Sequence, residues 1–256
     1  MGTGAAGPAA PGWQLSGARR LLVADLGRRP YGEVLELQRR LCRARQAGET
    51  TEDLLLLVEH EPVVTLGRGT KETSLPLSPE QIRARGVEVF DVERGGDVTF
   101  HGPGQLVGYP ILDLSHHRQD LHWYLRTVEE ALIVALGTMG IPAERSAGQT
   151  GVWTKGRKIA SIGIHVKQWV TFHGFALNVS TELDYFDLIV PCGISGVTMT
   201  SVQRELGSAA PANLAAATRD AVTAALGRVF DRVPQPALPQ DWNLPEPDSV
   251  PETTPP

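Results

Sequence analysis

Residues 94–110 read RGGDVTFHGPGQLVGYP and place two expected strands in direct succession. The segment from Asp97 to His101 alternates polar and apolar side chains, which is the period of a half-buried strand. An apolar run from Leu106 to Leu112 follows it after the turn-forming sequence GPG. Because no helical pattern separates the two, the segment departs from the strand–helix–strand order of a parallel α/β sheet.

The rest of the chain extends this pattern. Helices are expected at about 30–47, 120–139 and 211–230, and a short one at Ser78-Pro79-Glu80-Gln81, which has the order of a capping box. Strands are expected at 54–58, 62–66, 151–154, 158–166, 170–179 and 187–190. Since the strands cluster between helices, we predict one α+β domain, a mixed β-sheet flanked by helices.

Both ends of the chain are expected to lie outside this domain. Residues 1–16 are mostly Gly, Ala and Pro, and in residues 234–256 prolines alternate with acidic and polar residues. Such compositions bury too little apolar surface to offset their ordering entropy, so we predict disorder. Trp242 is the exception, and we expect it to pin part of the tail to the body. The folded domain is therefore predicted to span 17–233.

Composition excludes several classes of protein. A net charge of −5 and a pI of about 5.8 leave no basic stripe for nucleic acid. No apolar run approaches the ~18 residues of a membrane helix, and the first residues lack the basic and apolar regions of a signal peptide. Two cysteines cannot form a disulfide framework. We therefore expect a soluble, cytoplasmic protein.

The glycine-rich block indicates a binding surface. Thr99 and His101 share one face of their strand with Asp97, opposite Val98 and Phe100. A pair of tight turns around a hairpin strand is the competing interpretation, but turns do not require three polar side chains on one face. The block matches neither GxxxxGK nor GxGxxG, so no nucleotide site is expected. Glycines, which permit positive φ and close approach of a ligand, stand at positions 95, 96, 102 and 104.

One cysteine and one lysine are candidate reactive groups. Cys192 lies between Pro and Gly, so we expect it in a turn with an accessible sulfur. A free cysteine is more often a small buried hydrophobe, and Cys42 in the first helix fits that interpretation. Lys158 begins a β-rich run. Its side chain could be partly desolvated, which would lower its pKa, or it could extend from the strand end into water. By simple alternation, Lys158 shares a face with Ala160, Ile162 and Ile164.

A contact between Lys158 and Cys192 would make chemical sense. The thiolate is the nucleophilic form of cysteine, and a nearby ammonium lowers the pKa of a thiol. The backbone at Gly193 could supply N–H donors to an oxyanion. A histidine base is the alternative partner for the sulfur, with His101 as the best candidate. The sequence leaves both arrangements open.

These segments together resemble the lipoyl(octanoyl) transferase family, which implies the fold of the biotin/lipoate protein ligase catalytic domain. They occur in order and span most of residues 17–205, whereas the tail after residue 233 is outside the family pattern. The matching signatures are LLLVEHEPVVTLGRG (55–69), RGGDVTFHGPGQLVGYPILDL (94–114), GRKIASIGIHV (156–166), FHGFALNV (172–179) and PCGISGVTMTSV (191–202).

The resemblance implies transfer of an octanoyl or lipoyl group from acyl carrier protein to a specific lysine of a lipoyl domain. Cys192 resembles the acyl-thioester nucleophile, and Lys158 resembles the residue that lowers the thiol pKa and acts as general acid and base. Residues in three of the signatures resemble substrate-binding contacts: Arg94, Gly95, Gly96, Asp97, Val98, Thr99, Phe100, His101, Ser161, Ile162, Gly163, Gly174, Phe175 and Ala176.

The resemblance also implies the partners. The donor is octanoyl-acyl carrier protein, and the acceptors are the lipoyl domains of 2-oxoacid dehydrogenases and the glycine-cleavage H protein. Because the acyl group arrives on the phosphopantetheine of the carrier, we expect no cofactor, no ATP and no metal. We expect the chain to act as a monomer, without nucleic acid or membrane partners.

Three other functions remain open from the sequence. In an ATP-dependent lipoate or biotin ligase on the same fold, a lysine at the place of Lys158 would hold an acyl adenylate, and Cys192 would be unnecessary. A non-catalytic acyl-binding module would bind the same group without reaction. A cysteine amidase would need His101 within reach of the sulfur.

Overall fold

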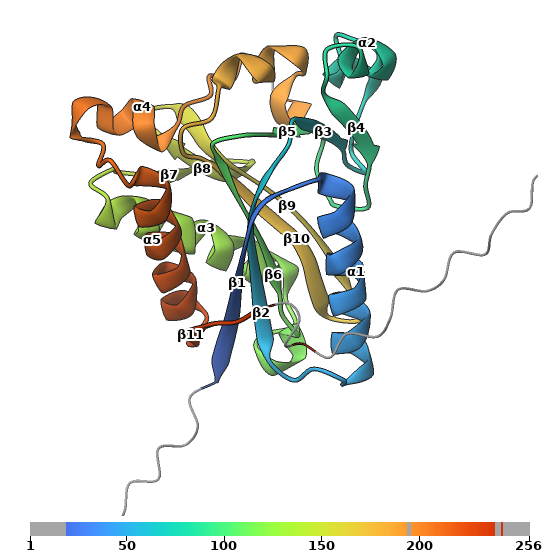
Figure 1. Cartoon of the computed structure of the whole chain (residues 1–256), viewed down its shortest axis with the longest axis vertical. Helices are drawn as coiled ribbons and strands as arrows, with labels where there is room; N and C mark the ends of the chain where they lie inside the picture. Colours follow the sequence, from blue (N-terminus) through green and yellow to red (C-terminus); the bar gives the residue numbers. More distant parts are fainter. Residues whose placement is uncertain (1–18, 194–195, 239–241, 243–256) are drawn as a thin grey trace, which may run out of the picture.

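The computed structural model describes residues 19–193, 196–238 and Trp242 (Figure 1). The described part contains a mixed sheet in the order β11-β1-β2-β6-β10-β9-β8-β7, in which β11, β1 and β2 run parallel and the remaining pairs are antiparallel. A smaller sheet has the order β4-β3-β5. The strands are β1 (Arg20–Arg29), β2 (Asp53–His60), β3 (Val63–Leu66), β4 (Glu88–Asp91), β5 (Thr99–His101), β6 (Gln105–Ile111), β7 (Glu144–Ser146), β8 (Gln149–Thr154), β9 (Arg157–Lys167), β10 (Val170–Asn178) and β11 (Val233–Pro236).

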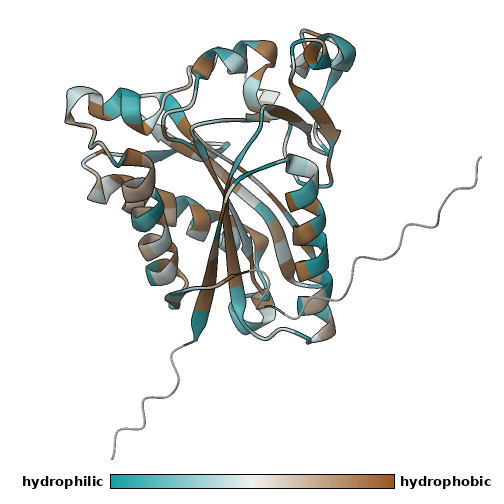
Figure 2. Cartoon of the chain, viewed as in Figure 1, coloured by the Kyte–Doolittle hydropathy of each residue, from teal (hydrophilic) through white to brown (hydrophobic). Residues whose placement is uncertain are grey.

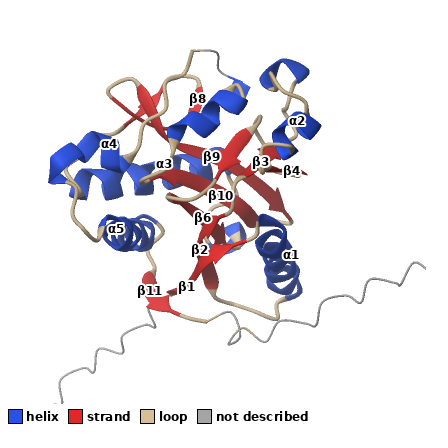
Figure 3. Ribbon diagram, turned by 45° about the horizontal axis from the view of Figure 1, so that its top comes forward, coloured by secondary structure: helices blue, strands red, loops and turns tan. Residues whose placement is uncertain are grey.

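Helices cover both faces of the large sheet, with α1 on one side and α3 and α5 on the other (Figure 3). Among the described residues, no helix combines the length and the apolar character needed to cross a membrane. The α-helices are α1 (Tyr31–Ala47), α2 (Pro79–Arg83), α3 (Leu121–Thr138), α4 (Val202–Leu206) and α5 (Leu214–Val229). Short 3-10 helices are η1 (Glu72–Ser74), η2 (Leu114–His116), η3 (Leu183–Leu188), η4 (Pro191–Gly193) and η5 (Gly207–Ala209).

The predicted α+β architecture is confirmed, and local sequence explains most element ends. Pro30 precedes α1, and Gly48 closes it in the left-handed conformation at φ 76. At α2 the capping box is complete, because Gln81 N–H donates to Ser78 Oγ while the Gln81 side chain accepts from Ser78 N–H.

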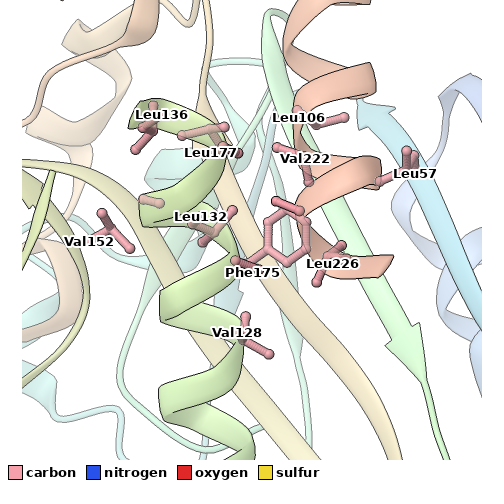
Figure 4. Packing of buried hydrophobic residues seen from close by; sticks show 14 of the residues in the cluster. Leu57, Leu106, Val128, Leu132, Leu136, Val152, Phe175, Leu177, Val222 and Leu226 are labelled. Atoms are coloured by element: carbon pink, nitrogen blue, oxygen red, sulfur yellow. The ribbon is translucent and has the colours of Figure 1, made fainter. Parts of the chain in front are cut away.

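Strand β2 shows why the sheet needs helices on both faces. Leu54 and Leu56 pack in the cluster on the α1 side, whereas Leu55 and Leu57 belong to the cluster beneath α3 and α5. This continuous apolar run is typical of a strand that is buried on both faces (Figure 2). Figure 4 shows the larger cluster, which also includes Val128, Leu132, Phe175, Val222 and Leu226.

The strand predicted at 187–190 is wrong. Residues Leu183–Leu188 form the 3-10 helix η3, and Ile189 N–H donates to Phe186 O. Phe186 and Ile189 are buried in a third cluster with Phe100 and Ile82, beneath the smaller sheet. The apolar run therefore anchors a helical turn in this cluster. Its side chains are apolar because they are buried, and a short buried helical turn has the same composition as a buried strand.

The expected domain boundary at residue 233 is corrected by strand β11. Its residues Val233–Pro236 pair in parallel with Arg20–Val23 of β1. Two prolines are tolerated there because β11 is an edge strand of the sheet. Trp242 is 8% exposed and packs in the cluster on the α1 side, which is the pinning expected for it. Of the segments predicted to be disordered, 1–16 and 234–256, residues 1–16, 239–241 and 243–256 lie outside the described residues.

A buried charge network ties this C-terminal strand to the body. Asp53, at the start of β2, is 3% exposed and accepts hydrogen bonds from Arg232 Nε and His117 Nε2, both at 2.7 Å. Arg45, in the last turn of α1, lies 3.5 Å from the other carboxylate oxygen. Burial opposes the charge of Asp53, but the hydrogen bonds and charges of His117 and Arg232 outweigh it and hold the Asp53 pKa below its ordinary value.

Replacing Asp53→Asn should lower the free energy of unfolding by about 3 kcal/mol, because it leaves buried cations without their shared carboxylate. Urea unfolding at pH 7 measures this change. The adjacent variant Glu52→Gln is the control: its partner Arg20 is half exposed, so it should cost at most about 1 kcal/mol. Equal losses in the two variants would contradict the role assigned to Asp53.

Candidate active site

Cys192 lies in the short 3-10 helix η4. Its backbone is left-handed, with φ 55 and ψ 21, and its side chain is partly exposed. Cys192 N–H donates to Val98 O at 3.0 Å, and Gly193 N–H donates to Val190 O at 2.9 Å. The sulfur is therefore accessible, as the flanking Pro and Gly predicted. The Gly193 N–H expected as an oxyanion donor is already engaged.

Lys158 contacts Cys192 directly. Its Nζ lies 2.9 Å from Cys192 Sγ and donates to Thr150 O at 3.2 Å. The residue is 1% exposed, and its ammonium lies 4.9 Å from the centre of the Trp153 ring. The two groups are 34 residues apart in sequence, so only the fold brings them together.

A bulge in β9 decides which way Lys158 points. Val152 pairs with Ala160 and Trp153 pairs with Lys158, so Ile159 has no residue opposite it. An extra residue in a strand reverses the alternation beyond it. Lys158 Nζ and Ser161 Oγ reach the same sulfur, the latter at 3.8 Å. The prediction that Lys158 shares a face with Ala160, Ile162 and Ile164 is wrong. It assumed regular alternation of side chains through residue 159, where the strand has a bulge.

A cavity of about 250 Å³ opens beside the pair. Most of the predicted substrate-binding residues line it: Arg94, Gly96, Asp97, Val98, Thr99, His101, Ser161, Ile162, Gly163, Gly174, Phe175 and Ala176. Two predicted contacts do not. Gly95 N–H donates to Ile164 O, and Phe100 packs in the cluster beneath the smaller sheet, stacked 4.7 Å from Tyr185.

Several residues of the cavity wall were not among the predicted contacts. Tyr31 comes from the first turn of α1, Tyr109 from β6, His173 from β10 and Thr150 from β8. Tyr109 and His173 lie within the signatures at 94–114 and 172–179 but were not predicted as contacts, whereas Tyr31 and Thr150 lie outside all five signatures. One signal was present nearby: Gly151 interrupts a β-rich run, where glycine often marks a close approach of another group.

Gly151 provides the space that Lys158 occupies. Its φ is +130, and a Cβ there would lie 2.6 Å from Ala160 O and 2.9 Å from Lys158 Cε. Gly193 is constrained in the same way, because a Cβ would lie 2.3 Å from Asp97 Oδ2. That carboxylate oxygen accepts from Ser74 Oγ at 2.7 Å. Glycine is therefore required on both sides of the Lys158–Cys192 contact.

His101 does not contact the sulfur. Its Nδ1–H donates to Gln105 Oε1 at 2.9 Å, and its ring stacks on Tyr31 at 5.9 Å. The hydrogen-bond partners of the sulfur within residues 19–193 and 196–238 are Lys158 and Ser161, and neither is a histidine. Burial, with a smaller contribution from His60, lowers the pKa of His101 to about 3. The ring is therefore neutral and structural at pH 7.

The described residues contain no group of three or more His, Cys, Asp or Glu side chains placed to hold a metal ion. The arrangement instead offers a buried amine in contact with an accessible thiol, at the wall of a cavity with both polar and apolar lining. These are the parts of a covalent site in which a cysteine attacks a carbonyl and a lysine moves the proton.

Comparisons with known proteins agree with this chemistry. Residues 30–228 match the family model described as the lipoyl protein ligase A/B catalytic domain. The octanoyltransferase of Gloeobacter violaceus is 52% identical over 184 residues, which cover 72% of this chain and 81% of that protein. The octanoyltransferase of Geobacter sulfurreducens is 47% identical over 218 residues, which cover 85% of this chain and 86% of that protein.

The fold is also found among solved structures. A structure of a bi-partite lipoate protein ligase and its E2 lipoyl domain from Thermoplasma acidophilum contains a chain that matches with a TM-score of 0.66. The match covers 88% of this chain and 90% of that one at 15% sequence identity. At this identity the likeness shows a common fold.

The variant Gly151→Ala should displace the Lys158 ammonium and slow alkylation of Cys192 by iodoacetamide at pH 7 about tenfold, because less thiolate is present. Cys42 does not interfere, since burial raises the pKa of its thiol to about 11. Gly156→Ala is the control, because Gly156 also has positive φ (+74) but has no atom within 4 Å of an added Cβ. Unchanged alkylation in Gly151→Ala would contradict the packing argument.

Stability should fall as the pH is lowered from 7 to 5. Burial lowers the pKa of His60 to about 4 and that of His101 to about 3. The unfolded chain takes up protons near pH 6.5 while the folded chain does not, so this stability is complete above 6.5 and is lost below it. We expect a loss of about 2 kcal/mol per histidine at pH 5 in urea unfolding. His60→Gln should halve the loss, and an undiminished loss would refute the assignment.

Proposed function

The chain belongs to the family of lipoyl protein ligase A/B catalytic domains, and on that premise we propose that it is an octanoyltransferase of protein lipoylation. It is an acyltransferase like its curated relatives, which match it over most of their length. The observation that carries the proposal is the contact of 2.9 Å between Lys158 Nζ and Cys192 Sγ beside a cavity.

The first half of the reaction loads the enzyme. Lys158 takes the proton of the Cys192 thiol, and the thiolate attacks the carbonyl carbon of an octanoyl thioester carried by acyl carrier protein. The bond from that carbon to the phosphopantetheine sulfur breaks, and Lys158 returns the proton to the leaving thiolate. One thioester replaces another, so this step is nearly balanced in free energy.

The second half transfers the group to an amine. A lysine of a lipoyl domain attacks the thioester on Cys192, and Lys158 accepts the proton that this amine must lose. The carbon–sulfur bond to Cys192 breaks, and an amide forms on the acceptor. Because the amide is more stable than the thioester, this step draws the sequence forward.

The cavity supports an aliphatic acyl group. Ile162, Val107, Phe175 and Ala176 supply apolar wall, and Gly174 lets the chain approach the backbone. Burying about seven methylene groups at ~0.8 kcal/mol each would contribute about 5 kcal/mol to binding. The cavity therefore suits a medium-length chain attached to Cys192 through its carbonyl.

We place the partners by the same reasoning. The donor is acyl carrier protein, and the acceptors are lipoyl domains, including those of 2-oxoacid dehydrogenases and the glycine-cleavage H protein, so the reaction belongs to the cytoplasm. The acyl group arrives already activated as a thioester, and the proposed cycle therefore uses no ATP, metal or cofactor. A monomer suffices, because Lys158, Cys192 and the cavity wall come from one chain.

The ATP-dependent ligase is the second candidate, since the fold accommodates both reactions. A ligase that forms an acyl adenylate has no use for a thiol in contact with its lysine. The pairing of Lys158 with Cys192 therefore favours the cysteine route. A cysteine amidase is disfavoured, because the sulfur contacts no histidine among the described residues.

Intact-protein mass after incubation with octanoyl-acyl carrier protein tests the proposal. The wild-type chain should gain one octanoyl group, and Cys192→Ala should gain none. Cys42→Ala is the matched control and should be acylated like wild type, because that thiol is buried in α1. Lys158→Ala should acylate at least ~100-fold more slowly, the scale of general acid–base catalysis.

Three outcomes would change the assignment of function or of residue roles. A wild-type chain that gains no octanoyl group would favour a binding module. Octanoylation of a lipoyl domain that needs ATP and persists in Cys192→Ala would establish the ligase reaction. Normal acylation of Lys158→Ala would remove the base but leave the nucleophile in place.

A further inference from the structure

Arg94 is a buried cation that donates no hydrogen bond to a carboxylate side chain in the part of the chain that the structure describes. It is 6% exposed, and all five of its N–H groups are used. Nε and NH2 donate to Thr65 Oγ1, NH2 also donates to Thr65 O, and NH1 donates to Gly95 O and Asp97 O. Each acceptor is a neutral carbonyl or hydroxyl oxygen. The guanidinium is thus fully hydrogen-bonded, but to neutral oxygen atoms only, and the Asp97 carboxylate acts on it through space.

The chain is built to hold this side chain beside the cavity. A Cβ at Gly67 would lie 2.7 Å from Arg94 NH1, and a Cβ at Gly163 would lie 2.9 Å from Arg94 Cδ. Arg94 and Cys192 both line the cavity. Two glycines, from the segment after β3 and from β9, therefore provide the space that places the cation at the reaction site.

A buried unpaired charge is strongly unfavourable unless it interacts with charge of the opposite sign. Burial lowers the pKa of Arg94, and Tyr31 and Cys192 are the groups that most oppose this by their negative forms. An arginine nevertheless stays protonated in proteins. Burial raises the pKa of Tyr31 and Tyr109, so both are neutral at pH 7. The charges that Arg94 can balance are therefore those of the Asp97 carboxylate and of the Cys192 thiolate.

Three charged groups lie near the sulfur of Cys192. Lys158 contacts it, Arg94 shares its cavity, and the carboxylate of Asp97 approaches Gly193. Asp97 disfavours a thiolate, and Lys158 gains and gives up a proton during the proposed cycle, so its charge is not permanent. Tyr31, Tyr109, His101 and His173 complete the titratable wall of the cavity. Arg94 is thus the permanent cation of this site.

We propose that Arg94 is a positioning residue that stabilises the Cys192 thiolate by its charge, without touching the reacting atoms. This inference rests on the proposed function, because it assigns a role in forming the nucleophile. Since every N–H of Arg94 is occupied, it acts through space, and it donates no hydrogen bond to the acyl group. Its fixed charge favours the ion pair that forms when the thiol proton moves to Lys158, and it offsets Asp97.

The rate of Cys192 alkylation by iodoacetamide as a function of pH tests this role in a Cys42→Ala background. Arg94→Met removes the charge, and the midpoint of the profile should rise by about one pH unit. Arg94→Lys keeps a cation and should restore most of the shift. A structural role would lower thermal stability without moving the midpoint, so an unmoved midpoint in folded Arg94→Met overturns the proposal.

A second pair of variants leaves Arg94 in place, in case Arg94→Met does not fold. Thr65→Asp puts a carboxylate against the guanidinium, whereas Thr65→Asn puts a neutral acceptor of the same size there. Thr65→Asp should raise the alkylation midpoint by about one pH unit relative to Thr65→Asn. Equal midpoints in the two proteins would overturn the proposal.

Octanoylation of the same proteins separates this inference from the proposed function. A wild-type chain that is acylated while the Arg94→Met midpoint is unmoved supports the transferase and overturns the role of Arg94. A wild-type chain that is not acylated while the midpoint shifts supports the electrostatic role and overturns the transferase.

Discussion

The contact between the Lys158 ammonium and the Cys192 sulfur is the constraint around which the site is arranged. A lysine that is 1% exposed needs polar partners, and it finds them in one sulfur and one backbone carbonyl. To reach them, β9 takes up a bulge at Ile159, and the neighbouring strand carries Gly151. The cysteine adopts a left-handed backbone on the other side. Each of these local irregularities accompanies the contact between Lys158 and Cys192.

The chain on both sides of the cysteine is held by backbone hydrogen bonds, after it to β9 and before it to η1. Lys158 N–H donates to Thr198 O, and Thr200 N–H donates to Lys158 O, so the segment after the cysteine loop pairs with the lysine itself. On the other side, Val190 N–H donates to Ser74 O. The loop that carries the sulfur is thereby anchored on both sides of Cys192.

Buried charged side chains lie at two places in this molecule, and their hydrogen-bond partners differ. At the edge of the large sheet, Asp53 is shared by Arg232, His117 and Arg45, which locks the C-terminal strand to the body. Beside the cavity, Arg94 donates its hydrogen bonds to neutral oxygen atoms only. The first arrangement stabilises the fold. The second leaves a positive charge beside the cavity, where we propose that it stabilises the Cys192 thiolate.

The sequence by itself determined the parts of the protein that depend on local order. Helix ends at Pro30, Gly48 and Ser78, the doubly buried strand β2 and the reactive pair all followed from periodicity, turn chemistry and a family resemblance. The tertiary structure decided what depends on contacts across the chain. The bulge at Ile159 turned Lys158 toward Ser161, the apolar run at 187–190 became part of a helical turn and its core anchor, and residues 233–236 joined the sheet. Register, pairing partners and the contacts of buried charges are relations between distant segments, and for that physical reason no local pattern encodes them.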